Sequence, residues 1–140
     1  ETYKIYDTIL EIITNTQMEE PKIFGEIALK KFLHDNKISE KLEKFEFLTT
    51  NKFTLFRENQ INEIGYELIE LNRYFDALKI FELNIIKFPN SANAFDSYAE
   101  VCLLIHDTTS AINNYQKALD IDPLYANSEY AKLIINQLKK

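Results

Sequence analysis

The sequence predicts an all-α protein with an internal repeat, and three observations lead to this fold class. Glycine (2 residues) and proline (3 residues) are scarce among the 140 residues, so the chain has few of the turn signals that β-hairpins and β-sandwiches need. Hydrophobic residues make up 46% of the chain and charged residues 27%, as in an ordinary globular domain. From residue 58 onwards, similar residues recur at an interval of 34 positions.

The first segment, residues 1–57, is expected to be helical without the 34-residue register. An apolar stripe with steps of three and four predicts an amphipathic helix that ends near Thr16. The stripe consists of Tyr3, Tyr6, Ile9, Leu10 and Ile13. A second helix is predicted from Pro21, which suits a first helical position, to about His34. Its expected buried residues are Ile23, Phe24, Ile27 and Phe32.

The remainder of this segment is expected to form one short helix and a connector. Ser39 is a candidate N-cap for a third helix. The apolar residues of that helix are Leu42, Phe45 and Leu48. In the stretch LTTNKFTLF, Phe53 and Leu55 alternate as in a strand, but a lone strand has nothing to pair with, so we predict a connector. Residues 1–57 are interpreted either as a degenerate repeat with an insertion or as a helical linker from an upstream domain.

The second segment, from Glu58, repeats its pattern in one register. Five pairs of similar residues are each separated by 34 positions: Ile64 and Tyr98, Leu68 and Cys102, Ala77 and Ala111, Phe81 and Tyr115, and Pro89 and Pro123. Packing explains such an interval, because an alanine allows two helices to approach closely and an aromatic residue one turn later fills the adjacent space. A proline then ends the second helix. We interpret the interval as architectural.

This 34-residue pattern resembles the tetratricopeptide repeat, a helix–turn–helix unit that stacks on its neighbours. The resemblance divides the chain into a first repeat at residues 58–91, a second repeat at 92–125 and a capping helix at 126–140. It implies a tetratricopeptide-like α-solenoid of antiparallel helix pairs, closed by that capping helix. The residues that match structural positions of the family are Gly65, Ala77, Phe81, Pro89, Ala99, Ala111, Tyr115, Ala118 and Pro123.

Two positions depart from the family pattern. Between the two helices of a repeat, where the family usually has glycine, this sequence has Asn72 and His106. Asparagine tolerates the left-handed conformation better than histidine does. The large aromatic residue expected early in the first helix is Ile61 in the first repeat and Phe95 in the second. The capping helix has a first-helix pattern at Tyr130, Leu133, Ile134 and Leu138.

In this family the first helices line a concave groove, and certain repeat positions point into it. Carried over to this sequence, the groove residues are Asn59, Asn62, Glu63, Tyr66, Ile69 and Glu70, then Asn93, Asp96, Ser97, Glu100, Leu103 and Leu104, with Asn127 and Tyr130 in the cap. The family's clamp for a C-terminal carboxylate needs lysine, arginine and asparagine there, but this row has no Lys or Arg. We therefore expect a protein or extended peptide of basic or neutral character as partner. The alternative is a merely hydrated face.

Composition and motifs argue against several other functions. A net charge of −6 disfavours nucleic acid and anionic membranes, and no apolar run approaches the roughly 20 residues of a membrane span. Two glycines are too few for a phosphate loop, a nucleophile elbow or a dinucleotide fingerprint, so we expect no catalytic residue or cofactor. A single cysteine and two histidines that lie far apart argue against a metal site. His34 and His106 are expected to cap helix ends. Cys102, the single cysteine, excludes an intrachain disulfide and is expected to be buried.

A second resemblance concerns the context of the module. The stretch INEIGYELIELNRYFDALKIFELNIIKFPNSANAFDSYAEV is similar to the repeat pair appended to some bacterial secreted hydrolases, among them serine esterases and β-lactamase-like proteins, whose catalytic residues are not present here. It implies a C-terminal accessory region of a larger bacterial protein, periplasmic if that protein is secreted and otherwise cytoplasmic. The rival interpretation is a structural module that forms a homodimer through its N-terminal helices, because YKIYDTILEII would expose an apolar stripe.

Overall fold

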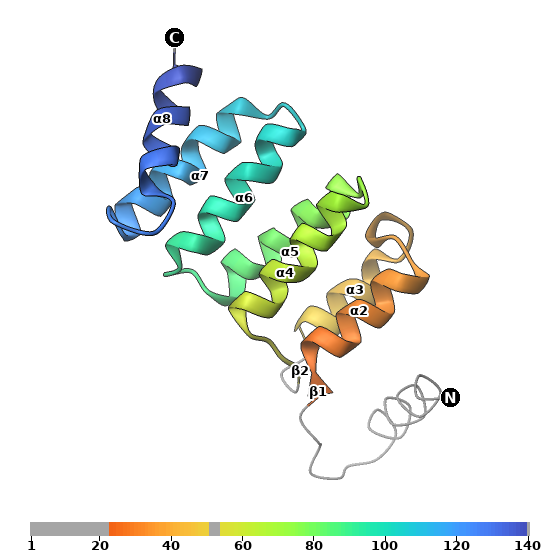
Figure 1. Ribbon diagram of the computed structural model, residues 1–140. Helices are drawn as coiled ribbons and strands as arrows, with labels where there is room; N and C mark the ends of the chain where they lie inside the picture. The colour runs from red at the N-terminus through yellow and green to blue at the C-terminus, as the bar shows by residue number, and fades with distance from the viewer. Residues whose placement is uncertain (1–22, 51–53, 140) are drawn as a thin grey trace.

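The computed structural model describes residues 23–50 and 54–139, which form a stack of helices (Figure 1). The elements are β1 (Ile23–Phe24), α2 (Gly25–Asp35), the 3-10 turn η1 (Ile38–Glu40), α3 (Leu42–Thr50), β2 (Thr54–Leu55), α4 (Glu58–Glu70), α5 (Tyr74–Lys87), α6 (Ala92–Leu104), α7 (Thr108–Ile121) and α8 (Ser128–Leu138). Each helix from α4 to α7 packs against the next one along the chain, which for α7 is α8. The expected all-α class is confirmed.

Helices α2, α4 and α6 lie side by side, with α2 in contact with α4 and α4 in contact with α6. Side chains bridge both contacts: Lys30 Nζ on α2 lies 3.2 Å from Glu67 Oε1 on α4, and Tyr66 on α4 hydrogen-bonds with Glu100 on α6. Helix α5 packs against both α4 and α6. Residues of α4 and α6 that point away from α5 and α7 therefore share one face, which we call the α4–α6 face.

The α4–α5 and α6–α7 turns are built in the same way, 34 residues apart. Asn72 and His106 have positive φ values of 57° and 62°, so both adopt the left-handed conformation expected at these positions. The next amide in each turn, on Arg73 and on Asp107, donates to a carbonyl five residues earlier, at 2.8 and 2.9 Å. This hydrogen-bond pattern is the Schellman motif, which ends a helix sharply and turns the chain back on it.

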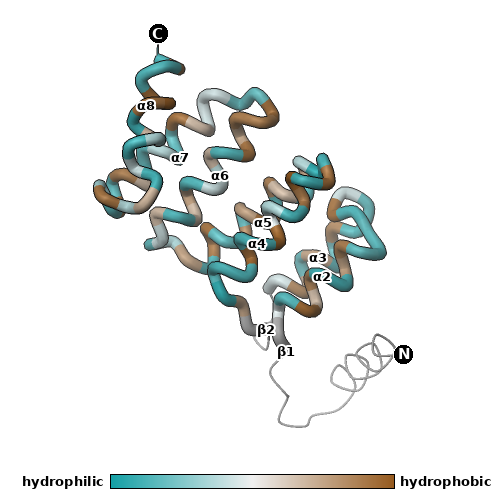
Figure 2. Tube along the Cα trace, in the orientation of Figure 1, coloured by the Kyte–Doolittle hydropathy of each residue, from teal (hydrophilic) through white to brown (hydrophobic). Residues whose placement is uncertain are grey.

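The core repeats along the stack in the same register. Ala77 and Ala111 are fully buried, as are Phe81 and Tyr115 one turn later. A Cβ atom added to Gly65 would collide with the Phe81 ring, so glycine permits the close approach of α4 and α5. Helices α5 and α7 end two residues before Pro89 and Pro123, as predicted. Figure 2 shows hydrophobic and hydrophilic segments alternating along the helices, as amphipathic packing requires.

The prediction for the start of the described region was partly wrong. Ile23 and Phe24 are not helical: they form β1, which pairs in parallel with Thr54 and Leu55 of β2. The alternating stretch near Leu55 therefore does have a strand to pair with, namely Ile23 and Phe24, which were predicted to be helical. Helix α2 begins at Gly25 and ends at Asp35, and Ile27, expected to be buried, is 37% exposed.

The third predicted helix also differs in detail. Ser39 lies inside η1 instead of capping the helix, and α3 begins at Leu42. Phe45 and Leu48 are buried as expected, whereas Leu42 is 45% exposed. The helix predicted to end near Thr16 lies outside the described residues.

The C-terminal helix α8 packs against α7 through a stripe that only partly matches the predicted one. Ala131 and Ile135 are buried, while Leu133 is 53% exposed and Tyr130 is 44% exposed. The predicted Ile134 packs against the core and Leu138 is partly buried, so the prediction is wrong for Tyr130 and Leu133 only.

A buried ion pair holds the N-terminal helices against α5. Arg73 donates to the backbone oxygens of Leu33 and Asn36 at the end of α2, at 2.6 and 2.8 Å. Asp76, which is 3% exposed, accepts from the Ile38 amide at 2.9 Å and pairs with Arg73 at 2.6 Å. These contacts satisfy backbone groups at the α2–η1 turn that would otherwise lack partners, so they fix this turn to the stack.

Candidate functional site

The predicted groove residues lie on α4, α6 and the start of α8, and they differ in exposure. Four of them are exposed: Asn59, Glu63, Glu70 and Asn93. Tyr130, at 44%, is also exposed. Two others, Asp96 and Ser97, are buried at 4% and 1%. Leu104 is as exposed as Tyr130, at 44%. The partly exposed residues are Asn62, Tyr66, Ile69, Glu100, Leu103 and Asn127. The row therefore has an exposed acidic and amide rim around a more buried polar interior.

Tyr66 links the two helices of the α4–α6 face. Its hydroxyl donates to Glu100 Oε2 at 2.6 Å and lies 3.1 Å from Ser97 Oγ. Burial, followed by the hydrogen bond to Glu100, raises the pKa of Tyr66 well above its usual value. The phenol therefore stays protonated and acts as a donor at neutral pH. The Tyr66 ring also contacts Phe81 edge-on, at 5.3 Å between ring centroids.

Asp96 is a carboxylate held inside the protein. One of its oxygens accepts from the Tyr125 hydroxyl, and the other accepts from Asn127 Nδ2 at 2.9 Å. Burial raises the pKa of Asp96, and the hydrogen bonds from Tyr125 and Asn127 oppose that rise. Asp96 is therefore a bonded interior group that ties α6 to the start of α8, and it is not a free charge on the surface.

Glu100 lies between this interior and solvent. Burial raises the pKa of Glu100, the hydrogen bond from Tyr66 lowers it, and the charge of Asp96 raises it further. Helices α4 and α6 contain no Lys or Arg that could neutralise these two carboxylates. A hydrogen-bond donor with positive charge would therefore be favoured next to Glu100.

Two buried polar atoms in this region have no hydrogen-bond partner among the described residues. They are the Tyr115 hydroxyl and Asn62 Oδ1. The Tyr115 side chain is fully buried, and its ring contacts Tyr130 edge-on at 6.4 Å between centroids. From its spacing, Tyr115 was predicted to be a packing residue equivalent to Phe81. The sequence does show a hydroxyl where the other repeat has phenylalanine, and that difference could have indicated a polar role for Tyr115.

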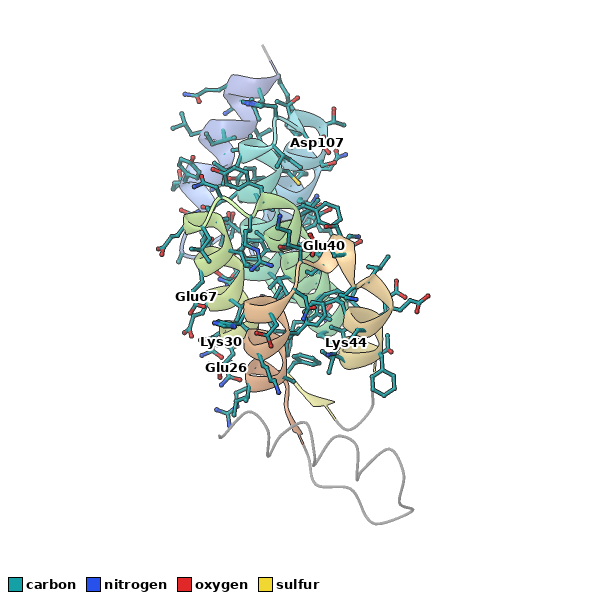
Figure 3. The ribbon with its side chains drawn as sticks, turned by 90° about the vertical axis from the view of Figure 1, so that its right-hand side faces the viewer. Glu26, Lys30, Glu40, Lys44, Glu67 and Asp107 are labelled. Carbon is teal, nitrogen blue, oxygen red and sulfur yellow. The ribbon has the colours of Figure 1, made fainter. Side chains whose placement is uncertain are left out.

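Lys30 on α2 is a basic residue that contacts α4, the first helix of the α4–α6 face. Figure 3 shows Glu26, Lys30 and Glu67 close together on α2 and α4. Lys30 Nζ lies 3.3 Å from Glu26 and 3.2 Å from Glu67, and the hydrogen bond to Glu67 is the main cause that raises the pKa of Lys30. Glu67 is thus paired, whereas the exposed Glu63 and Glu70 remain available on the same helix.

The remaining candidate residues have structural surroundings. Cys102 is 1% exposed, and burial raises the pKa of its thiol to about 11, so it stays protonated and packs as a small apolar group. His34 is exposed beside Asp35, with Nδ1 at 2.8 Å from Oδ1. Within residues 23–50 and 54–139, no group of three or more His, Cys, Asp and Glu side chains is placed to hold a metal ion. In the same ranges, no helix is long and apolar enough to cross a membrane.

No protein-family model matches the chain, and no curated protein matches it.

Proposed function

We propose that this chain is a noncatalytic interaction module of the tetratricopeptide type, which binds a basic or neutral extended peptide segment along the α4–α6 face. The repeat assignment draws support from the two matching turns at Asn72 and His106 and from the matching buried residues 34 positions apart, Ala77 with Ala111. Features that recur in this register are typical of stacked helical repeats.

The observation that carries the proposal is the charge of the α4–α6 face. Helices α4 and α6 contain six carboxylates and no Lys or Arg: Glu58, Glu63, Glu67, Glu70, Asp96 and Glu100. Asp96 is buried and Glu67 is paired with Lys30. The charge of the face therefore comes mainly from Glu63, Glu70 and Glu100. Because like charges on one face repel one another, a cationic segment that lies across them lowers their electrostatic energy. An anionic C-terminus would meet charges of its own sign on this face, and their repulsion disfavours the carboxylate-binding mode seen elsewhere in the family.

The shape of the face suits an extended ligand. The Tyr66–Glu100 hydrogen bond joins α4 and α6 at positions 34 residues apart, so exposed amides and acids continue from one helix to the next. Asn59 and Asn93 are exposed at equivalent positions, and such amides can both donate to and accept from a peptide backbone. A row of this kind offers hydrogen bonds to successive residues of an extended chain.

The test compares two double variants with the same change in net charge. Glu63→Gln with Glu70→Gln alters the α4–α6 face, and Glu43→Gln with Glu46→Gln alters exposed positions of α3. Fluorescently labelled eight-residue peptides of basic, neutral and acidic composition are titrated into each protein at low and physiological salt. We expect the basic peptides to bind best, binding to weaken with salt, and only the first double variant to lose affinity. Preference for acidic peptides, or equal losses in both double variants, would overturn the proposal.

Two predictions about context stay open to direct measurement. The proposed homodimer through the N-terminal helices concerns residues 1–22, which lie outside the described residues, and light scattering over a range of concentrations checks it. The proposed role as accessory region of a larger bacterial hydrolase rests on the sequence resemblance, and the sequence of the complete gene product checks that.

A further inference from the structure

The hydroxyl of Tyr115 is a polar group that packing does not require. At the equivalent position 34 residues earlier, Phe81 fills the same kind of fully buried site without a hydroxyl. The Tyr115 hydroxyl has no hydrogen-bond partner among the described residues. A buried hydroxyl without a partner destabilises the folded state, and phenylalanine would avoid that cost. Its position therefore points to a partner outside the chain.

The surroundings of this hydroxyl are negatively charged and aromatic. Burial is the main cause that raises the pKa of Tyr115, and the negative charges of Glu100 and Asp96 raise it further. Helix α8 connects the two sites, because Asn127 at its start donates to Asp96 and Tyr130, one turn later, contacts the Tyr115 ring. Tyr130 contacts the Tyr115 ring edge-on and is 44% exposed, so an aromatic side chain next to Tyr115 reaches solvent. Glu100 also accepts a hydrogen bond from Tyr66 on α4.

The same region contains unused acceptor atoms. Asn62 Oδ1 is buried without a hydrogen-bond partner among the described residues, one helical turn before Tyr66 on α4. Glu100 is partly exposed and accepts from Tyr66 through one oxygen, and a carboxylate has capacity for further donors. With acceptors from two helices and no cation on either, the site suits a ligand group that is positively charged and carries several donors.

We propose that the cluster of Tyr66, Glu100, Tyr115 and Tyr130 binds the guanidinium group of an arginine side chain in the bound peptide. This inference rests on the proposed function, because it names the chemistry that the α4–α6 face recognises. A guanidinium has five N–H donors in a planar arrangement, pairs with a carboxylate through two hydrogen bonds and stacks on aromatic rings. Lysine offers a compact ammonium that matches separated acceptors and tyrosine rings less well.

The experiment uses three probe peptides with acetylated and amidated ends, Ser-Asn-Xaa-Asn-Ser, in which Xaa is arginine, lysine or citrulline. Citrulline has nearly the shape of arginine but no charge. Binding is measured by calorimetry at physiological salt, where exposed charges are largely screened beyond about 8 Å. We expect the arginine peptide to bind more tightly than the lysine peptide and about tenfold more tightly than the citrulline peptide.

Three variants separate the cluster from the general charge of the face. Glu100→Gln keeps an acceptor for Tyr66 and removes the charge, and we expect it to weaken the arginine peptide about tenfold. Glu63→Gln removes an exposed charge on the same face and should weaken it by less than about twofold. Tyr115→Phe copies the residue at position 81, so it should raise the denaturant midpoint and still weaken the arginine peptide about threefold or more.

The outcomes distinguish this inference from the proposed function. Unchanged affinity in Tyr115→Phe, with a higher midpoint, would overturn the cluster, because the hydroxyl would then be a packing feature that solvent alone satisfies. Equal losses in Glu63→Gln and Glu100→Gln would also overturn it and leave the acidic face as the binding surface. Equal binding of all three peptides, still sensitive to the α4–α6 double variant, would reject arginine recognition and retain the module. Absence of any peptide binding would reject both.

Discussion

The Tyr66 hydroxyl donates a hydrogen bond of 2.6 Å to the carboxylate of Glu100, and the two residues are 34 positions apart at equivalent places on α4 and α6. The interval that sets the hydrophobic packing of the stack therefore also sets a polar contact between neighbouring helices. Because both side chains are only partly buried, this contact forms where the core meets the α4–α6 face. The stack and the proposed binding surface therefore share this pair.

Replacement of Tyr66 by phenylalanine should lower the free energy of unfolding by about 1 kcal/mol, because a hydrogen bond to a charged group is lost at a partly exposed site. Denaturant unfolding measures the change. Tyr74→Phe is the matched control, since the Tyr74 hydroxyl donates to an exposed Asn72 at 2.8 Å. The control should lose less than about 0.5 kcal/mol. Equal losses in both variants would show that the Tyr66–Glu100 hydrogen bond stabilises the fold no more than the exposed Tyr74–Asn72 hydrogen bond does.

Stability should depend on pH through Glu100. Burial raises the pKa of Glu100 in the folded state, so folding favours its protonated form. The stabilisation that this group contributes is complete below the ordinary carboxyl pKa and is lost as pH rises through the raised folded-state pKa. The free energy of unfolding of the wild type, measured relative to Glu100→Gln, should therefore fall as pH rises above the ordinary carboxyl pKa of about 4.

The comparison between these two proteins matters because other carboxyls act in the opposite direction. Hydrogen bonds from Ser110 lower the pKa of Asp107, whose contribution is lost as pH falls. Asp107 is the same in both proteins, so its effect cancels in the difference. A difference that rises with pH would contradict the raised pKa of Glu100.

Enlarging the alanines between paired helices should destabilise the stack. Ala77→Leu and Ala111→Leu are each expected to lower the free energy of unfolding by about 1 to 3 kcal/mol, because both sites are fully buried and leave no room for extra methyl groups. Ala126→Leu, at an exposed position, is the control and should change it by less than about 0.5 kcal/mol. Unchanged denaturant midpoints for both buried sites would contradict the close helix contact.

Removal of Asp76 should loosen the N-terminal helices. Asp76→Ala leaves Arg73 unpaired and deprives the Ile38 amide of its acceptor, so we expect a loss of about 3 kcal/mol. Glu82→Ala on the same helix breaks the more exposed pair with Lys79 and should cost less than about 1 kcal/mol. Hydrogen exchange should rise in α2 and α3 before α6 and α7. A uniform rise over all helices would show that Asp76 does not act locally.

The sequence predicts the stack from α4 onwards well because its signals are local and repeated. Alanine and aromatic residues at fixed spacing and prolines after helix ends report packing directly, and Asn72 and His106 occupy the turn positions where a left-handed residue was expected. The same reasoning failed near Ile23, because parallel pairing with Thr54 joins segments 31 residues apart and no local pattern specifies it. Propensity rules do not describe such non-local pairing.

The candidate site was predicted only in outline. The residue positions on α4 and α6 followed from the repeat pattern, but the burial of Asp96 did not, because its partners Tyr125 and Asn127 come from the loop before α8. The unpaired hydroxyl of Tyr115 was likewise invisible, since the aromatic ring alone satisfies the packing pattern. Hydrogen-bond satisfaction depends on three-dimensional neighbours and not on spacing along the chain.

The measurement that tests the account most directly is an NMR titration of the isotope-labelled chain with the arginine peptide described above. Binding along the α4–α6 face predicts that the largest shift changes lie on α4 and α6 and at the start of α8, with Glu100, Tyr115 and Tyr130 among them, while α3, α5 and the rest of α7 change little. These shift changes should be much smaller in Glu100→Gln at the same peptide concentration. Shift changes centred on α3, α5 or α7, or unaffected by Glu100→Gln, would contradict the account.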